Sequence, residues 1–182
     1  IGLSNSFNRH VIAEGVESIE HGLMLLLMGC ELAQGYVISA PIPASDFPHW
    51  LKEYEPIEQW LHSGNHQMSK RDKRTNIFKI VSEHWLTRFI EVVQSPDENT
   101  LPWPVMTNKH DHCGQWIKRE KQERVFSQEG LDKLDQAHLA FHTIAHSIQA
   151  QHQNGDVKST TKEVEQLHEA FDNMKMALEQ CK

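Results

Sequence analysis

Two histidines, His138 and His142, stand four residues apart in the segment HLAFH. On an α-helix, side chains at this spacing share one face with their Cβ atoms about 5–6 Å apart, so both imidazoles can reach one metal ion. Both also fall on an apolar stripe, which predicts a position inside a helical domain. The alternative is a pair of hydrogen-bonded core histidines, so further candidate ligands are needed to separate the two interpretations.

His84 and Cys113 could complete such a site. His84 lies on a predicted apolar helix stripe, and Cys113 in the segment HDHCGQW belongs to a predicted shorter helix. Three imidazoles and one thiolate form a tetrahedral set that Zn²⁺ accepts, and a helical bundle can hold it between facing helices. Cys113 could instead be a small buried hydrophobe. His146 continues the face of the histidine pair, either as a partner of the ligands or as part of the core.

The order of these motifs, HW, then CGQW, then HLAFH, resembles the CZB domain, a zinc-binding bundle of bacterial chemoreceptors and cyclic di-GMP enzymes. The resemblance covers about residues 75–152. The zinc ligands that it implies are His84, Cys113, His138 and His142.

The segment around the cysteine departs from this family. Its pattern is Cys-x-Leu-Gly-x-Trp, whereas the segment CGQW is two residues shorter. If Gly114 and Trp116 keep the family register, the ligand falls near Asp111, with His110 and His112 beside it. A thiolate is the softer ligand that zinc prefers, which favours Cys113.

Two carboxylates in VIAEGVES, residues 11–18, form a second candidate site. The apolar run predicts a short buried strand, and Ser18 could cap a helix over residues 19–28 that ends at Gly29. A second strand is expected over residues 33–37, which makes one parallel strand–helix–strand unit. Glu14 then lies at the carboxyl end of a strand, where such sheets carry reactive residues. Glu14 and Glu17 could also be ordinary loop acids beside a helix N-terminus.

The segments AEGVES and LMLLLMGCELAQGYVISAPIP resemble the last quarter of EAL domains, the bacterial phosphodiesterases that linearise cyclic di-GMP. The resemblance spans about residues 1–55. It implies a variant (β/α)8 barrel, a pair of Mg²⁺ or Mn²⁺ ions, and catalytic roles for Glu14 and Gln34. Two divalent ions held by oxygen ligands can polarise a phosphodiester and activate water.

The other EAL ligands, including the Glu-Ala-Leu motif and an Asp-Asp pair, have no counterpart here. A complete barrel needs about 250 residues, far more than the resemblance covers. We therefore expect this chain to be a C-terminal piece of a longer protein, inactive by itself, whose remaining catalytic residues lie upstream. Ile1 in place of an initiator Met agrees with this expectation.

Beyond residue 62 the chain changes to long helical periods and carries nine of its 13 histidines, which predicts a domain boundary near Ser63. Helices are expected over about 68–94, 106–124, 127–153 and 158–180. Their predicted buried stripes are Ile77, Ile80, Val81, His84 and Arg88 or Phe89 in the first; Leu131, Leu134, His138, Phe141, His142, Ala145 and Ile148 in the third; and Val164, Leu167, Phe171, Met174 and Leu178 in the fourth.

Composition excludes several classes. A formal net charge of −7 argues against nucleic-acid binding. The longest apolar run, residues 23–28, is far shorter than the roughly 20 residues that cross a bilayer. Three cysteines without framework spacing favour a reducing cytoplasm. Leucines of an incomplete barrel would stay partly exposed, and this favours a homodimer.

The sequence thus predicts a mainly α protein: residues 1–62 form a βαβα remnant of an EAL barrel, and residues 63–182 form a CZB-like four-helix bundle. The predicted function is a zinc-sensing bundle attached to a cyclic di-GMP phosphodiesterase. The alternative is a degenerate, non-catalytic EAL barrel that binds cyclic di-GMP or a partner, with the bundle as a structural or dimerising module. A di-iron bundle is weaker, because interior Glu-x-x-His repeats are lacking.

Overall fold

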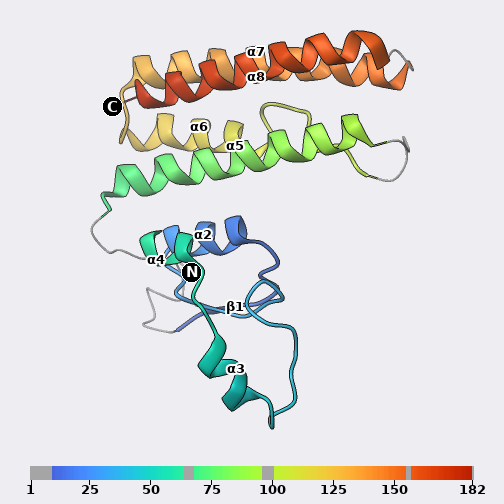
Figure 1. Cartoon of the computed structure of the whole chain (residues 1–182). Helices are drawn as coiled ribbons and strands as arrows, with labels where there is room; N and C mark the ends of the chain where they lie inside the picture. The colour runs from blue at the N-terminus through green and yellow to red at the C-terminus, as the bar shows by residue number, and fades with distance from the viewer. Residues whose placement is uncertain (1–9, 64–67, 96–100, 155–156, 182) are drawn as a thin grey trace. The chain divides into compact units, whose positions relative to one another are not determined.

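A computed structural model describes residues 10–63, 68–95, 101–154 and 157–181 (Figure 1). The chain divides into two compact units, Ile1–Ile77 and Phe78–Lys182. This division falls inside helix α5 (Lys70–Gln94), whereas the sequence predicted a boundary near Ser63. The described chain is mainly helical, and its one sheet has two strands.

The first unit contains the predicted strand–helix–strand arrangement, but its first strand is not buried as predicted, because Ile12 is 59% exposed. Strand β1 (Ile12–Ala13) pairs in parallel with β2 (Leu32–Ala33), and α2 (Ile19–Leu27) connects them. The Ser18 side chain caps α2 by accepting a hydrogen bond from the backbone N–H of His21 at 3.1 Å. Gly29 follows the helix with φ +84°, a conformation that glycine adopts without strain.

The second strand is shorter than predicted because the chain turns after Gln34. The backbone N–H groups of Ile38 and Ser39 donate to the carbonyl of Gly35 at 2.9 and 3.1 Å. Two further helices follow, α3 (Phe47–Glu53) and α4 (Glu58–Ser63). From α4, the Trp60 indole N–H donates to the carbonyl of Ile19 at 2.9 Å, which fixes α4 against α2.

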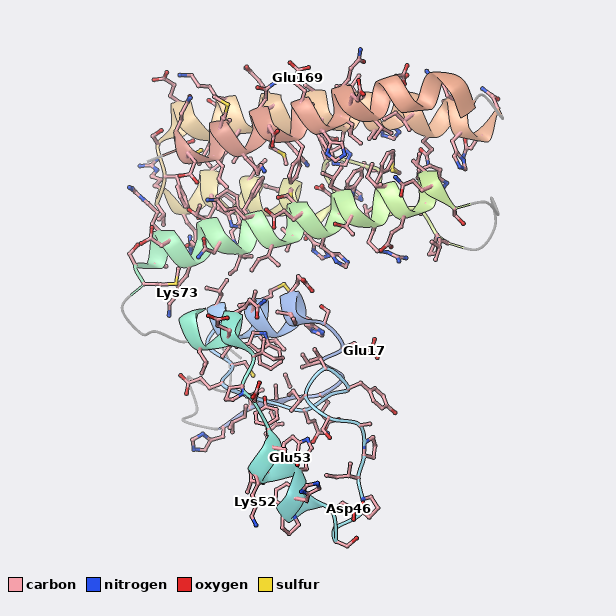
Figure 2. The ribbon with its side chains drawn as sticks, in the orientation of Figure 1. Glu17, Asp46, Lys52, Glu53, Lys73 and Glu169 are labelled. Carbon is pink, nitrogen blue, oxygen red and sulfur yellow. The ribbon has the colours of Figure 1, made fainter. Side chains whose placement is uncertain are left out.

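The second unit contains α5 from Phe78 onward, α6 (His112–Glu123), α7 (Gln128–Gln153) and α8 (Val157–Glu179), which lie alongside one another (Figure 1). Side chains fill the space between these helices, whereas Glu169 lies on the outer side of α8 (Figure 2). The predicted stripe of α7 is confirmed, because all seven of its side chains are buried. In α8, four of the five predicted positions are buried and Val164 is partly exposed.

The stripe predicted for α5 was wrong except at Phe89, which is buried. The buried side chains of this helix are Phe78, Ser82, Trp85, Leu86, Phe89 and Val92. Large aromatic rings on this face pack into the interior: Trp85 contacts Phe141 of α7, and Phe78 contacts Trp116 of α6, with centroid separations of 5.1 and 4.9 Å. The rotation of the buried face places His84 among the exposed residues.

Helix α6 begins at His112, later than the predicted start near residue 106. Residues 102–106 have no regular structure, and Pro102 and Pro104 disfavour a helix there. Asp111 caps the helix in an extended conformation (φ −71°, ψ 167°). The preceding segment is therefore a loop, and this loop carries Asp111 to the interior.

Candidate metal centre

Asp111, His138 and His142 converge in the interior of the second unit. The Oδ2 atom of Asp111 lies 3.0 Å from the Nε2 atom of each histidine. All three residues are buried, with exposed fractions of 3, 1 and 2%. One potential ligand atom from each lies within 4.8 Å of the other two, a separation that allows them to hold one ion. This cluster contains the predicted HxxxH pair, but its third member is an aspartate.

Helix geometry and a tight loop bring the three groups together. His138 and His142 are one turn apart on the buried face of α7, with ring centroids 4.6 Å apart. The Oδ1 atom of Asp111 accepts a hydrogen bond from the backbone N–H of Gly114 at 2.7 Å, which caps α6. A Cβ at Gly114 would lie 1.7 Å from the carbonyl oxygen of Asn108, so only glycine permits this fold of the loop. The cap leaves Oδ2 directed at the histidines.

The hydrogen bond of Nδ1 in His142 determines whether Nε2 of the neutral ring carries a proton or a lone pair. Nδ1 lies 2.8 Å from the carbonyl oxygen of Met106, and because a carbonyl only accepts, Nδ1 must donate. In the neutral ring Nε2 then carries a lone pair, which faces the Asp111 carboxylate at 3.0 Å. Two acceptors at this distance need a cation between them, either a proton on Nε2 or a metal ion. A carbonyl that fixes the tautomer is also the usual arrangement behind a metal-bound imidazole.

His138 carries an unsatisfied nitrogen. Its Nε2 contacts Asp111, but its buried Nδ1 has no hydrogen-bond partner in the described part of the chain. Buried polar atoms are satisfied in most proteins, and an exception indicates a site with a further constituent. Two imidazoles that share one carboxylate oxygen, beside an unsatisfied nitrogen, are more consistent with a ligand site than with a relaxed core network.

The carboxylate of Asp111 is a buried negative charge. Burial by itself raises the pKa of Asp111, but hydrogen bonds from His138, His142 and the Gly114 N–H outweigh it and lower the pKa to about 2. The carboxylate is therefore ionised at neutral pH and attracts a cation.

Cys113 has a different environment. Its exposed fraction is 3%, and its thiol is not part of the cluster of potential ligands among the described residues. Burial, together with the nearby charge of Asp111, raises the pKa of this thiol well above its ordinary value. A thiol must lose its proton to bind a metal, so the structure favours a neutral, packed side chain here.

A pocket of about 280 Å³ adjoins the cluster and has Asp111 in its wall. Helix α5 supplies His84, Trp85 and Arg88 to the same wall. Trp85 donates its indole N–H to the carbonyl of Val105 at 2.8 Å and places its ring against that of His142, with centroids 4.9 Å apart. His84 is exposed and does not join the three clustered residues. The pocket leaves room for a further ligand on the Asp111 side.

The remaining histidine candidates lie outside the cluster. His110 and His112, the sequence neighbours of Asp111, are both exposed. His146 is exposed as well, so it does not belong to the core, and its role as a partner of the ligands stays a prediction. The sequence named Asp111 only as an alternative. Its clearest local signal is a helix-capping residue directly before α6.

Glu14 and Gln34 of the first unit follow β1 and β2 at the carboxyl ends of the strands. Their backbones are adjacent, because the N–H of Gln34 donates to the carbonyl of Ala13 at 2.8 Å and its carbonyl accepts from Val16 at 3.1 Å. Both residues are exposed. The prediction that Glu14 lies at the carboxyl end of a strand is confirmed, whereas Gln34 was expected inside the second strand and instead follows it. The catalytic roles of both residues remain a prediction.

Comparison with known proteins finds relatives for about a third of the chain, all from Escherichia coli K12. The chain is 39% identical over 56 residues to the oxygen sensor protein DosP, covering 31% of this chain and 7% of DosP. It is 44% identical over 59 residues to the probable cyclic di-GMP phosphodiesterase PdeN, and 37% identical over 54 residues to the cyclic di-GMP phosphodiesterase PdeR. These matches cover 32 and 30% of this chain, and 11 and 8% of the respective relatives.

The chain thus spans about a tenth or less of the curated relatives it matches. No family model and no solved structure matches. The partial matches support a region related to EAL cyclic di-GMP phosphodiesterases, and their lengths agree with the extent of the EAL resemblance in the sequence. None of the helices in the described ranges has both the length and the apolar character that a bilayer crossing needs.

Proposed function

We propose that this chain joins the C-terminal part of a cyclic di-GMP phosphodiesterase of the EAL type to a CZB-like four-helix bundle that senses zinc. The buried cluster of Asp111, His138 and His142 supports the metal-binding part of this proposal. The matches to relatives named as cyclic di-GMP phosphodiesterases support the enzymatic part. The complete protein acts in the cytoplasm as a homodimer.

Glu14 and Gln34 contribute to catalysis in the complete barrel. Their adjacent backbones, at the carboxyl ends of two parallel strands, suit a site in which several strands each supply one or two residues. Mg²⁺ or Mn²⁺ at that site polarises the phosphodiester of cyclic di-GMP and activates water. Two residues are too few to hold paired ions, so this chain alone does not hydrolyse cyclic di-GMP.

Zinc suits the second unit because its interior offers imidazole and carboxylate donors, which Zn²⁺ accepts in tetrahedral geometry. His138 and His142 are the first two ligands in this proposal, because the sequence pairs them at helical spacing and both lie in the buried cluster with Asp111. His84, in the wall of the adjoining pocket, is the candidate for a further ligand after a change of rotamer. Cys113 is the remaining candidate from the sequence.

Zinc can regulate the enzyme only if it binds two arrangements of the protein with different affinity. The cluster connects α7 to the loop before α6, two segments more than 25 residues apart in the chain. Binding a cation there stabilises the arrangement in which the loop and α7 are close. Removal of the cation leaves the lone pair of His142 facing a carboxylate, which favours separation or protonation.

The decisive experiment measures hydrolysis of cyclic di-GMP by the complete protein, with and without a zinc-selective chelator while Mg²⁺ is in excess. We expect the chelator to change the rate of the wild type and to leave the rate of His138→Ala unaffected. An unchanged wild-type rate would remove the sensor role. A complete protein that binds cyclic di-GMP without hydrolysing it would support the degenerate-barrel alternative, and turnover by this chain alone would contradict the assignment as an incomplete site.

A further inference from the structure

We infer that the third protein ligand of the metal site is the carboxylate of Asp111, so that the site consists of two imidazoles and one carboxylate and contains no thiolate. The inference rests on the proposed metal binding and specifies the class of ion that the site selects.

Distance separates the two candidate ligands. Oδ2 of Asp111 is 3.0 Å from both Nε2 atoms, whereas Cys113 has no place in the group of ligand atoms within 4.8 Å of one another. Asp111 is the N-cap of α6 and Cys113 is the second residue of that helix. Side chains two positions apart on a helix do not share a face, so one ion at the histidine pair cannot take both without a change in the first turn.

The two oxygens of Asp111 have separate partners. Oδ1 accepts from the Gly114 N–H at 2.7 Å, and Oδ2 faces the histidines. The capping hydrogen bond holds the Asp111 carboxylate in place before a metal binds, whereas a side chain without such a bond would have to be ordered by the metal. Nδ1 of His138 is unsatisfied, and in the neutral ring of His142 the Nε2 lone pair faces the Asp111 carboxylate because Nδ1 donates to Met106. The cluster is therefore not saturated by its own hydrogen bonds.

The donor set determines metal preference. Two imidazoles and a carboxylate suit Zn²⁺, Co²⁺, Ni²⁺ and Fe²⁺, whereas a thiolate shifts preference toward softer ions such as Cd²⁺. Three protein ligands also leave a fourth position, and the pocket beside Asp111 gives it access to solvent and to His84. The site should therefore show little preference for Cd²⁺ over Zn²⁺, and its fourth ligand should be exchangeable.

Co²⁺ serves as the probe, because a cobalt–thiolate bond gives an intense charge-transfer band in the near ultraviolet and a site of nitrogen and oxygen ligands does not. We expect the wild-type chain to bind Co²⁺ without that band, and Cys113→Ser to bind with unchanged affinity. Asp111→Asn should lose more affinity than the roughly 10–100-fold that follows from removing an outer hydrogen-bonding partner. Asparagine caps helices as well as aspartate does, so this variant preserves the start of α6.

A second variant tests directly whether residue 111 binds the metal. Asp111→Cys combined with Cys113→Ser should gain the charge-transfer band, because it places a thiolate where the carboxylate lies. A wild-type band that disappears in Cys113→Ser would overturn this inference and leave the proposed metal site intact, as would undiminished affinity in Asp111→Asn. Absence of Co²⁺ and Zn²⁺ binding by the folded wild-type chain would overturn both.

Discussion

His142 and His146 provide a matched pair for testing metal-dependent stability. They lie one turn apart on α7, but His142 is buried in the cluster and His146 is exposed. We expect zinc to raise the melting temperature of the wild type and of His146→Ala by similar amounts. His142→Ala should lose this increase, because it removes one of the two imidazoles that face Asp111.

The size of the effect follows from linkage. A ligand at 100 times its Kd stabilises the folded state by about 2.7 kcal/mol. The second unit, Phe78–Lys182, is close to the size at which 1 kcal/mol shifts Tm by roughly 4–8 °C, so zinc should add about 10–20 °C. Without metal, His142→Ala should cost about 2–5 kcal/mol, because it leaves a cavity beside Trp85 and removes the partner of the Met106 carbonyl.

Thermal unfolding followed by far-ultraviolet circular dichroism, with zinc or with chelator, gives both quantities. Zinc content of the purified variants provides an independent readout. If His142→Ala does not fold, His138→Ala makes the same test, since its Nε2 contacts the same oxygen. The assignment of the site to this cluster would be refuted if zinc still raised the melting temperature of both variants. It would also be refuted if zinc no longer raised the melting temperature of His146→Ala.

Two further predictions concern Asp111 and its loop. Gly114→Ala should destabilise the second unit by about 1–3 kcal/mol and weaken zinc binding, because its Cβ would overlap the carbonyl of Asn108. Urea denaturation measures the loss of stability, and metal titration measures the loss of zinc affinity. Unchanged values would contradict the close approach of the two backbones. In chelator, Asp111 should contribute about 2 kcal/mol of stability above its ordinary pKa of 3.8, which is lost as pH falls through its folded pKa of about 2. Asp111→Asn should lack this contribution, and a wild type and variant with equal pH dependence would disprove it.

Sequence periodicity predicted α7 well and α5 poorly, for a physical reason. Along α7 the apolar residues form a single stripe, so the sequence offers one face for burial. Along α5, Ile77, Ile80 and Val81 define one stripe while Phe78, Trp85 and Phe89 define another, rotated by about one residue. Aromatic rings bury more apolar area than aliphatic side chains, and the second stripe faces the interior. The choice between them depends on partner helices that the α5 sequence does not contain.

The third member of the cluster was accessible from the sequence only in part. Asp111 before a helix is a recognisable cap, but the cap accounts for just one of its oxygens. That the other oxygen reaches α7 depends on the loop from residue 105 to 111, on the Asn108 carbonyl against Gly114, and on the Met106 carbonyl that orients His142. Backbone carbonyls have no side-chain signature, so the sequence could not show this geometry, and the preference of zinc for a thiolate favoured Cys113 over Asp111.

In the proposed site, the two oxygens of Asp111 would connect metal binding to helix α6. A cation that attracts Oδ2 pulls on the same carboxylate whose Oδ1 holds the first turn of α6, so the start of that helix and the position of α7 respond together. Cys113, Trp116 and Ile117 follow on the buried side of α6, and Trp116 contacts Phe78 of α5. We therefore expect a change at the proposed metal site to be passed on through these packed side chains. Any effect of zinc on the rest of the protein should depend on the contact between Trp116 and Phe78. Replacing Trp116 with a smaller apolar residue should therefore weaken that effect while all proposed zinc ligands stay in place.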